Sequence, residues 1–544
     1  MSENAGRLRA RATCTVLLAL AAAATGLHAA PWQRDTLVPG SLFRGIHGLA
    51  FGPDGRIYVG SVMGQSIYRV DPASGASEVF VPPPQGLADD VEFAPDGTMY
   101  WTGFDHGTMN AMKPGGPARV IASGLPGLNS LALDARGRLF GSQVFAGDAL
   151  WEFDPEGARP PRLVLKDLGG LNGFDFGPDG RLCGPLWFRR QVACIDVDTG
   201  ALEVVAEGFT QPAAANFDAR GVLHAIDNET GEIFRIDTVR HARERVARAP
   251  SNLDNLAFDA ADRLFVTNMS DNAIYEVDRA GGGVRKVTGS ALTLPGGLAA
   301  SGGTLFVADA FTLSAVDLAS GAVRDISRSL ADNGFPTGVA ATADRLLTVS
   351  FASGRAELWE LASGRPVAHW AGLVQPGAVA ALDAGRFAVT ELGNGGRLLL
   401  LDATDTATMR VLAEGLQQPM GLARGATGYY VSESAAGRIV ALGDDGTRRV
   451  VAEGLDRPDG LALLADGTLA VAERGTGRLL GVDPATGAVT VLGTELPLEL
   501  PGIDTTAHPA FPTGVAQGPD GAIYLSAARD GSIVRLRRTA ACSH

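Results

Sequence analysis

The sequence predicts an all-β protein built as two consecutive six-bladed β-propellers, with twelve four-stranded blades. A unit of about 42 residues recurs twelve times, with the skeleton G-L-A-F-x-P-D-G-R-I-Y-V followed by S-I-Y-R-V-D. Each copy holds four short apolar-polar runs separated by turn signals, and glycine is abundant (71 residues). Four strands in a repeat of roughly 40–45 residues are typical of a propeller blade.

The first copy shows how a blade is expected to form. An apolar inner strand covers residues 47–51, and a Gly-Pro-Asp-Gly turn leads into a second strand at 56–60. A third strand at 66–70 is followed by an Asp-Pro-Ala-Ser-Gly turn and a fourth strand at 77–81.

The two ends of the chain are out of phase with the blades. Residues 34–38 resemble a fourth strand, and the chain finishes on a third strand at 532–536. We expect 34–38 to complete the sixth blade of the first ring and 284–287 to complete the last blade of the second, which leaves no sheet edge exposed. One ring of twelve blades has the same strand count but a very wide central hole. Two propellers, at 30–280 and 281–544, are therefore favoured.

Residues 1–29 read as a secretory signal peptide. A basic start with Arg7, Arg9 and Arg11 precedes a short apolar run at 16–24 and a small-residue cleavage site near Ala29. No later stretch reaches the ~18 apolar residues that a membrane span needs. We expect a periplasmic or secreted protein with no membrane span.

The charge of the chain bears on its partners. The net charge is −14, and removal of the signal peptide takes away three Arg and one Glu, which leaves −16. Such an acidic body argues against nucleic acid and anionic membranes as partners. A small-molecule substrate or ligand is expected, and a protein partner remains possible.

Three cysteines follow the signal peptide. Cys183 and Cys194 flank a turn on neighbouring strands of one repeat, and an oxidising compartment favours a disulfide between them. The alternative is two unrelated buried thiols. Cys542 is then unpaired near the C-terminus.

The residue just before each inner strand should lie at one mouth of the central channel. The first ring places there His47, Asp89, Asn129, Asn172, Ala213 and Asp254. The second ring places there Gly296, Thr337, Gly377, Met420, Asp459 and Thr513. The first ring therefore directs five polar groups toward one point.

Carboxylate and amide oxygens with one imidazole suit a single divalent cation. Ca²⁺ is preferred, and Mg²⁺, Mn²⁺ or Zn²⁺ are also possible. The predicted ligands are His47, Asp89, Asn129, Asn172 and Asp254. The alternative is that these residues only cap strand ends, since Asn and Asp favour turns.

The ends of the second strands form another tier beside the same mouth. In the first ring this tier includes Gln143 and Asn268 as candidate substrate contacts. In the second ring it is acidic, and with the mouth aspartate the candidates are Asp309, Glu391, Glu433, Asp459 and Glu473. These groups could hold a second cation or belong to solvated loops.

Two loops near the first mouth carry further candidates. Asp105 and His106 place a carboxylate beside an imidazole, which suits general-base catalysis on a water; a surface turn is the alternative. Trp187 with Arg189 and Arg190 could give a ligand an apolar floor and an anion contact. No serine-hydrolase elbow, phosphate-binding loop, dinucleotide fingerprint or H-E-x-x-H motif is present.

Residues 51–58 (F-G-P-D-G-R-I-Y), Leu171-Asn172-Gly173 and Pro458-Asp459-Gly460 resemble the senescence marker protein/gluconolactonase/luciferin-regenerating superfamily. They also resemble its relatives with NHL repeats and the streptogramin B lyases. The resemblance implies six-bladed propellers, one divalent cation in the channel and hydrolysis of lactones. Asn129 and Asn172 match the family's middle-blade Asn positions.

The sequence also departs from that family's pattern. His47 stands where a Glu is expected, and Ala213 where an Asp is expected. Asp254-Asn255 resembles the Asp-Asn pair of the paraoxonase branch, but one blade late. The doubled propeller is also unusual.

Three functions follow as hypotheses. The first is an exported, metal-dependent hydrolase of a lactone or related cyclic ester, with His106 or His47 activating water. The second is a non-catalytic propeller that binds a ligand or protein. The third, a streptogramin-lyase-like lyase, rests on the acidic cluster of the second ring.

Overall fold

The computed structural model describes residues 32–328, 330, 334–504 and 511–539. The predicted signal peptide and Cys542 lie outside these residues. Within them, 48 strands form twelve sheets of four antiparallel strands each. No helix in the described ranges is long and apolar enough to cross a membrane. The all-β prediction is confirmed.

The first six sheets contain strands β2 to β25 in chain order. Their bounds are β2 (Leu49–Phe51), β3 (Ile57–Ser61), β4 (Ser66–Val70), β5 (Ser77–Val81), β6 (Val91–Phe93), β7 (Met99–Gly103), β8 (Thr108–Met112), β9 (Arg119–Ala122), β10 (Leu128–Leu133), β11 (Leu139–Gln143), β12 (Ala149–Phe153), β13 (Arg162–Lys166), β14 (Asp175–Phe176), β15 (Leu182–Leu186), β16 (Gln191–Ile195), β17 (Leu202–Ala206), β18 (Pro212–Phe217), β19 (Leu223–Asp227), β20 (Glu232–Asp237), β21 (Ala242–Arg248), β22 (Leu253–Phe258), β23 (Leu264–Asn268), β24 (Ala273–Val277) and β25 (Val284–Thr288). A short 3-10 helix, η1 (Trp187–Arg189), follows β15.

The other six sheets contain β26 to β48 together with the first strand of the chain, β1 (Trp32–Val38). Their bounds are β26 (Pro295–Ser301), β27 (Thr304–Asp309), β28 (Thr312–Asp317), β29 (Val323–Ser327), β30 (Gly338–Ala341), β31 (Arg345–Ser350), β32 (Arg355–Glu360), β33 (Arg365–Ala371), β34 (Pro376–Ala381), β35 (Arg386–Glu391), β36 (Arg397–Asp402), β37 (Asp405–Glu414), β38 (Pro419–Gly425), β39 (Gly428–Glu433), β40 (Arg438–Gly443), β41 (Arg448–Glu453), β42 (Pro458–Leu463), β43 (Leu469–Glu473), β44 (Arg478–Val482), β45 (Val489–Gly493), β46 (Val515–Gln517), β47 (Ile523–Ala527) and β48 (Ser532–Arg538). The 3-10 helices η2 (Ser434–Ala436) and η3 (Arg474–Thr476) follow β39 and β43.

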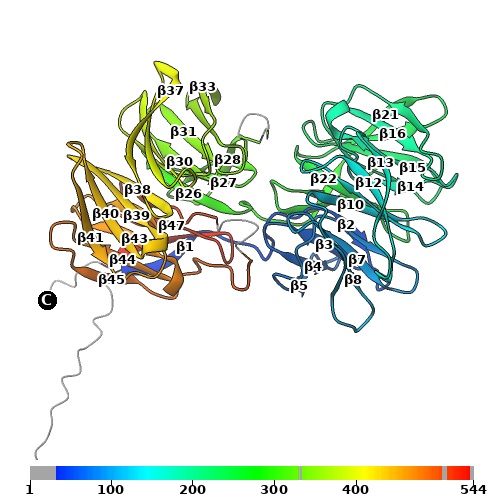
Figure 1. Ribbon diagram of the computed structural model, residues 1–544, viewed down its shortest axis with the longest axis horizontal. Coiled ribbons are helices and arrows are strands. Elements are labelled where there is room, and N and C mark those ends of the chain that lie inside the picture. The colour runs from blue at the N-terminus through cyan, green and yellow to red at the C-terminus, as the bar shows by residue number, and fades with distance from the viewer. Residues whose placement is uncertain (1–31, 329, 331–333, 505–510, 540–544) are drawn as a thin grey trace, which may run out of the picture.

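The sheets close into two rings. The inner strand β2 contacts both β6, the next inner strand, and β22, the inner strand of the sixth sheet. In the same way β26 contacts both β30 and β46. The chain thus forms two six-bladed propellers, seen as two bodies side by side in Figure 1.

The closing strands are exchanged relative to the sequence prediction. β1 pairs with β48, with Trp32 opposite Arg538, so the start of the chain completes the last blade of the second ring. β25 pairs with β24 and completes the sixth blade of the first ring. The expectation that 34–38 closes the first ring and 284–287 the second is therefore wrong. The side chains favour the observed pairing, because Arg535 of β48 forms a 2.8 Å ion pair with Asp35 of β1.

The local strand predictions for the first blade are close to the observed bounds. β4 and β5 coincide with the expected third and fourth strands, and β3 is shifted by one residue. The inner strand is shorter than expected, because the residues before Leu49 also form backbone hydrogen bonds to the neighbouring blade. The Gly48 N–H donates to the Asp89 carbonyl of the next blade over 2.7 Å. The mouth residues therefore turn from their own sheets toward the axis.

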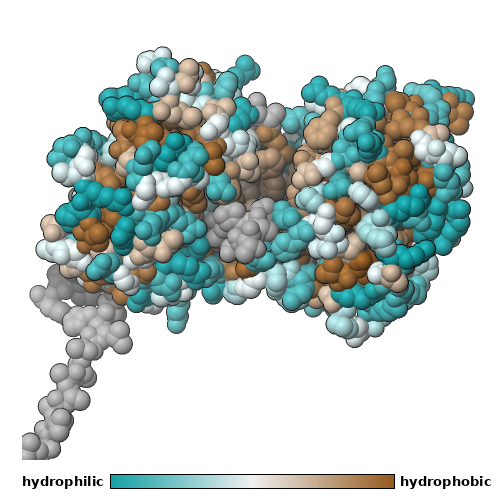
Figure 2. All heavy atoms as spheres, in the orientation of Figure 1, coloured by the Kyte–Doolittle hydropathy of each residue, from teal (hydrophilic) through white to brown (hydrophobic). Residues whose placement is uncertain are grey.

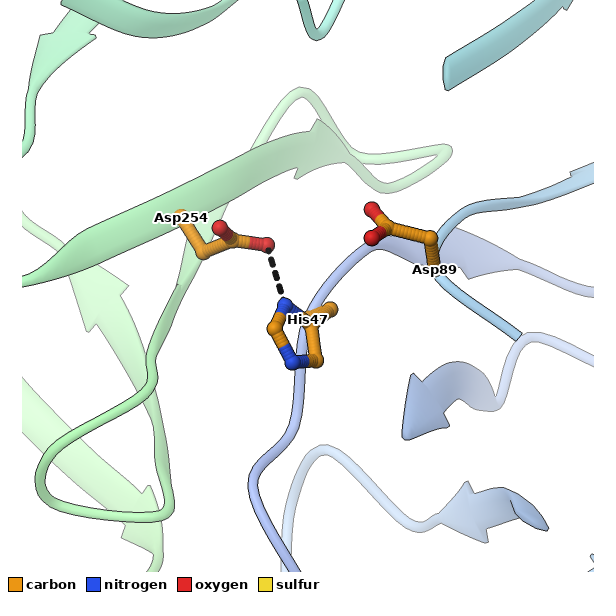
Figure 3. A group of neighbouring side chains, drawn as sticks. All are labelled: His47, Asp89 and Asp254. Atoms are coloured by element: carbon orange, nitrogen blue, oxygen red, sulfur yellow. Dashed lines mark ion pairs between the residues drawn. The ribbon is translucent and has the colours of Figure 1, made fainter. Parts of the chain in front are cut away.

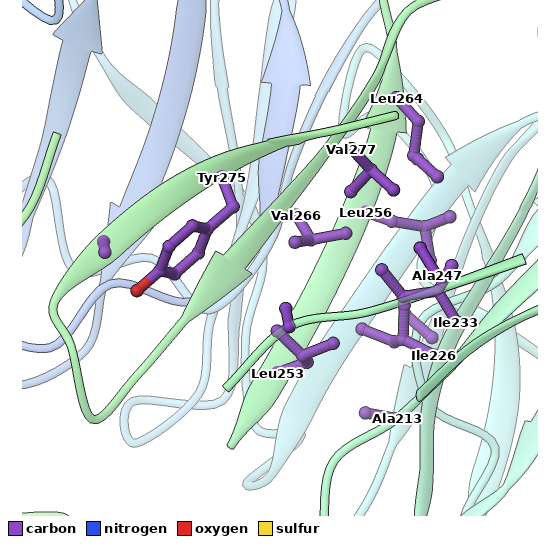
Figure 4. Packing of buried hydrophobic residues seen from close by; sticks show 13 residues of the cluster. Ala213, Ile226, Ile233, Ala247, Leu253, Leu256, Leu264, Val266, Tyr275 and Val277 are labelled. Carbon is purple, nitrogen blue, oxygen red and sulfur yellow. The ribbon is translucent and has the colours of Figure 1, made fainter. Parts of the chain in front are cut away.

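Neighbouring blades are held together by hydrophobic layers between their faces. Figure 4 shows one such layer, where Ile226 and Ile233 of the fifth blade pack against Leu256 and Val266 of the sixth. Each such side chain contributes about 1.5–3 kcal/mol when fully buried. Close approach at the axis needs small residues, since a Cβ on Gly173 would lie 2.2 Å from the Ala214 Cβ.

Cys183 of β15 and Cys194 of β16 lie directly opposite each other in the sheet register. Their sulfur atoms form a disulfide with an S–S distance of 2.00 Å. The bond links two adjacent strands of the fourth blade, both of them buried.

Candidate functional site

Three charged side chains meet at the mouth of the first ring. His47 precedes β2, Asp89 precedes β6, and Asp254 lies at the start of β22 (Figure 3). One ligand atom from each of them lies within 4.8 Å of the others. The His47 Nδ1 atom is 3.5 Å from an Asp254 carboxylate oxygen. The alignment of the repeats thus leads to side chains that converge in space.

The pKa values of this group reflect burial among carboxylates. Burial alone would lower the pKa of His47, but the charges of Asp254, Asp89 and Asp105 raise it to about 9. Burial raises the pKa of Asp89 to about 7, and the charges of Asp254 and Asp105 add to the rise while His47 opposes it. Buried carboxylates next to each other favour a bound cation, because a cation would remove their mutual repulsion.

Asn129 and Asn172 extend the donor set around the same mouth. Both side chains are largely buried, and both line the cavity above the three charged groups. The Ser130 hydroxyl reaches the Oδ1 atoms of Asn129 (2.8 Å) and Asn172 (3.1 Å), and it accepts the Gly173 N–H over 2.8 Å. The Ser130 hydroxyl thus lies within hydrogen-bond distance of both amide oxygens and can donate its hydrogen to either. The mouth position of the fifth blade carries only the methyl group of Ala213.

A second polar layer lies one residue further along the inner strands. Asp90 accepts hydrogen bonds from the Asn255 side chain and from the Val91 N–H, each over 3.0 Å. Burial, followed by the charge of Asp89, raises the pKa of Asp90 well above its usual range. The sequence prediction missed this layer, although the alignment that placed Asp89 and Asp254 also puts Asp90 and Asn255 in register.

Some of the candidate residues in the two predicted loops line the cavity, and others lie outside it. Asp105 and Trp187 line the cavity, but His106 does not. Instead the His106 Nε2 atom lies 3.4 Å from a carboxylate oxygen of Asp504. The structure therefore leaves His106 outside the group that contains His47.

The other predicted substrate contacts make hydrogen bonds away from the cavity. The Arg189 guanidinium donates to the Asp167 carbonyl over 2.7 Å, and neither it nor Arg190 lines the cavity. Gln143 accepts from the Trp151 indole (2.7 Å) and donates to a backbone carbonyl. Asn268 donates to the carbonyls of two loop residues that precede β22.

The second-ring candidates are buried and already partnered. Three of the glutamates pair with arginines of the following strand: Glu391 with Arg397 (2.6 Å), Glu433 with Arg438 and Glu473 with Arg478 (2.7 Å). Asp309 accepts backbone N–H groups from Thr293 and Leu294, and Asp459 lies 3.3 Å from Arg474. Among the described residues, no second group of three metal-ligating side chains comes as close together as the first-ring group.

A cavity of about 750 Å³ lies between the two propellers, over the first mouth. The charged and amide groups of the first ring form one end of it. Its hydrophobic walls come from both rings and include Met63, Phe104, Phe145, Trp187, Met269, Phe311, Phe335, Phe351, Leu392, Met420 and Phe511. Hydrophobic surface is visible in the hollow between the two bodies in Figure 2. The sequence prediction did not foresee that the second ring faces this mouth.

Comparisons with known proteins give only a fold-level likeness. No known family model matches the sequence, and no curated protein matches it. A putative gluconolactonase solved by a structural genomics consortium is 16% identical with a TM-score of 0.38, covering 47% of this chain and 94% of that chain. A gluconolactonase from Xanthomonas campestris has the same identity and score, covering 47% of this chain and 90% of its own. At this level of similarity, neither structure indicates what this chain binds.

Proposed function

We propose that the first propeller binds a divalent cation and catalyses the hydrolysis of a lactone or related cyclic ester at that site. The single observation that carries the proposal is the convergence of His47, Asp89 and Asp254 in the wall of a cavity. Asn129 and Asn172 would complete the set of ligands. Oxygen donors with one imidazole suit Ca²⁺ or Mg²⁺, while Mn²⁺ or Zn²⁺ would also accept the imidazole.

When bound, the cation would polarise the ester carbonyl and stabilise the negative charge that develops on its oxygen. The chain's own groups would orient the substrate and move the proton. Asp105, which faces the cavity beside this group, is the proposed general base. Asp105 takes a proton from the water as the water oxygen forms a bond to the carbonyl carbon. The ring C–O bond then breaks, Asp105 returns that proton to the departing ring oxygen, and the product is an open-chain hydroxy acid. His47 acts in this proposal as a ligand and not as a base.

A second candidate function is ligand binding without catalysis. The observation that favours it is Ala213, which leaves one of the six mouth positions of the first ring without a donor. The lyase hypothesis has no comparable support, since its acidic cluster is paired with arginines and backbone groups. From the predicted signal peptide we further propose that the protein acts outside the cytoplasm.

The test measures cation affinity by calorimetry and hydrolysis of a lactone panel at neutral pH. We expect Asn172→Ala and Asp254→Ala each to weaken cation binding by about tenfold or more and to reduce hydrolysis in parallel. Asp96→Asn, at an exposed turn aspartate of the second blade, is the control and should change neither. Unchanged cation affinity and unchanged hydrolysis in both site variants would disprove the proposal. Cation binding with no hydrolysis of any lactone would favour the binding function.

A further inference from the structure

The cavity wall has two chemically different parts. One part consists of the charged and amide groups of the first mouth. The part that the second ring supplies is hydrophobic, with Phe311, Phe335, Phe351, Met420 and Phe511. A volume of about 750 Å³ is in the range of cavities that hold drug-sized molecules, roughly 300–1,000 Å³.

The second ring packs against one of the proposed cation ligands, His47. The ring of Phe311, in the β27–β28 turn, packs edge-on to the His47 imidazole with 6.1 Å between centroids. On its other side Phe311 packs edge-on to Phe335, 5.9 Å away. Phe311 is itself buried in a cluster with Met269 of the first ring and Leu294 and Ala310 of the second. The aromatic wall and the mouth are thus parts of one packed unit.

Most polar side chains in the rest of the wall already donate to the backbone. The Gln211 amide donates to the Trp187 carbonyl (3.0 Å), and the Asn228 amide donates to the Leu253 carbonyl (2.8 Å). The Thr337 hydroxyl donates to the Val349 carbonyl (3.2 Å). A polyhydroxylated sugar lactone would leave buried hydroxyls poorly paired in this cavity, which is unfavourable. A hydrocarbon group would lose no hydrogen bonds there.

We infer that the ligand is a lactone or ester with one carbonyl group and a large apolar body, which the second propeller recognises. The inference rests on the proposed function for the position of the carbonyl at the first mouth. The apolar body lies against the aromatic wall of the second ring. The second propeller therefore acts in specificity and not as a second catalytic unit.

The experiment measures binding by calorimetry, with 2-alkylcyclopentanones from methyl to octyl as non-hydrolysable probes, in the presence of Ca²⁺. Each added methylene should increase affinity about fourfold until the cavity is filled. Ala352→Trp should abolish the gain for the long probes and leave the short ones bound, because Ala352 is an exposed residue in the cavity wall. The matched control is Ala362→Trp, at an exposed turn of the same blade but outside the cavity.

Phe351→Ala is a second variant, which removes hydrophobic area from the cavity wall instead of filling the cavity. It should reduce the increase in binding affinity that each added methylene of the probe gives. Affinity that does not depend on chain length, or a gain that neither cavity variant changes, would overturn the inference. Tighter binding of a polyhydroxylated cyclic ketone than of the octyl probe would also overturn it. Chain-length-dependent binding without hydrolysis of the corresponding lactones would instead contradict the proposed catalytic function, so the two failures are distinguishable.

Discussion

At the residue scale, the site depends on differences between otherwise equivalent positions. Asn129, Asn172 and Asp254 occupy the mouth of the first ring, where the second ring has mostly small or uncharged residues such as Gly296 and Gly377, with Asp459 as the one charged residue. Both rings have the same backbone architecture, so only the side chains distinguish them. The proposed site is therefore confined to the first ring, because its side chains and not its fold carry the proposal.

The ion pair between His47 and Asp254 gives a residue-scale prediction for the cation-free protein. The His47 imidazole should titrate near pH 9 by NMR. Burial alone would lower its pKa, but the charge and hydrogen bond of Asp254 together with the charges of Asp89 and Asp105 outweigh that effect. In Asp254→Asn the pKa should fall markedly, since burial then acts with less opposition. The other histidine resonances serve as internal controls and should not move. A His47 pKa that is the same in both proteins would show that the two side chains do not interact.

The sequence predicted the mouth residues better than the loop residues. Position along a repeated strand determines where a side chain lies, so His47, Asp89 and Asp254 could be brought together from register alone. A loop lacks this constraint. Asp105 lines the cavity while the adjacent His106 pairs with Asp504, which lies between β45 and β46 of the second ring. A repeat pattern describes each blade and carries no information about contacts between the two rings.

At the element scale, the turns of the blades use buried aspartates. Asp218, in the turn between β18 and β19, accepts the N–H groups of Arg220 and Val222 over 2.9 and 3.0 Å. Its other oxygen lies 2.9 Å from the Arg279 guanidinium. Burial alone would raise the pKa of Asp218, but the hydrogen bonds from the Val222 N–H and from the side chain and N–H of Arg220 lower it to about 2. The turn is therefore stabilised by an ionised carboxylate.

Asp218→Asn should lower the free energy of unfolding by about 2 kcal/mol at pH 7, as measured by urea denaturation. Because the folded pKa is depressed, this stabilisation is present above pH 3.8 and is lost as the pH falls toward about 2. The difference between variant and wild type should therefore shrink between pH 5 and pH 3. A difference that stays constant over that range would show that the ionised form is not what stabilises the turn.

The exchanged closing strands show a limit of prediction at this scale. Both β1 and β25 have the character of an outer strand, with two successive exposed residues near the start. Backbone hydrogen bonds in an antiparallel pair do not depend on the side chains, so either strand could pair with either third strand. The contacts that favour β1 beside β48 include the Asp35–Arg535 ion pair, which joins residues 500 positions apart. The sequence pattern alone gave no sign of that pairing.

At the scale of the whole molecule, the two rings are joined by polar contacts as well as by the aromatic wall. Arg328, which follows β29 of the second ring, pairs with Asp271 of the first ring over 2.9 Å. The same guanidinium donates to the carbonyl of Ser251 (3.2 Å) and to Asn268 (3.3 Å). Asn268, which the sequence suggested as a substrate contact, therefore lies in the joint between the rings. The geometry of the cavity depends on this joint, since its walls come from both sides.

Arg328→Ala should lower the free energy of unfolding by about 2–3 kcal/mol, because it removes charged hydrogen bonds and leaves the largely buried Asp271 without its ion pair. Calorimetric unfolding is the measurement, and Arg345→Ala is the control. Arg345 pairs with Glu360 within a single blade near the surface, so its loss should cost less than about 1 kcal/mol. A double-mutant cycle with Asp271→Ala separates the pair from other effects of the substitutions. If the losses of unfolding free energy in the two single variants add up to that of the double variant, the pair does not couple the rings. A coupling energy of about 1 kcal/mol or more, on the order expected for contacting residues, would show that the ion pair stabilises the joint between them.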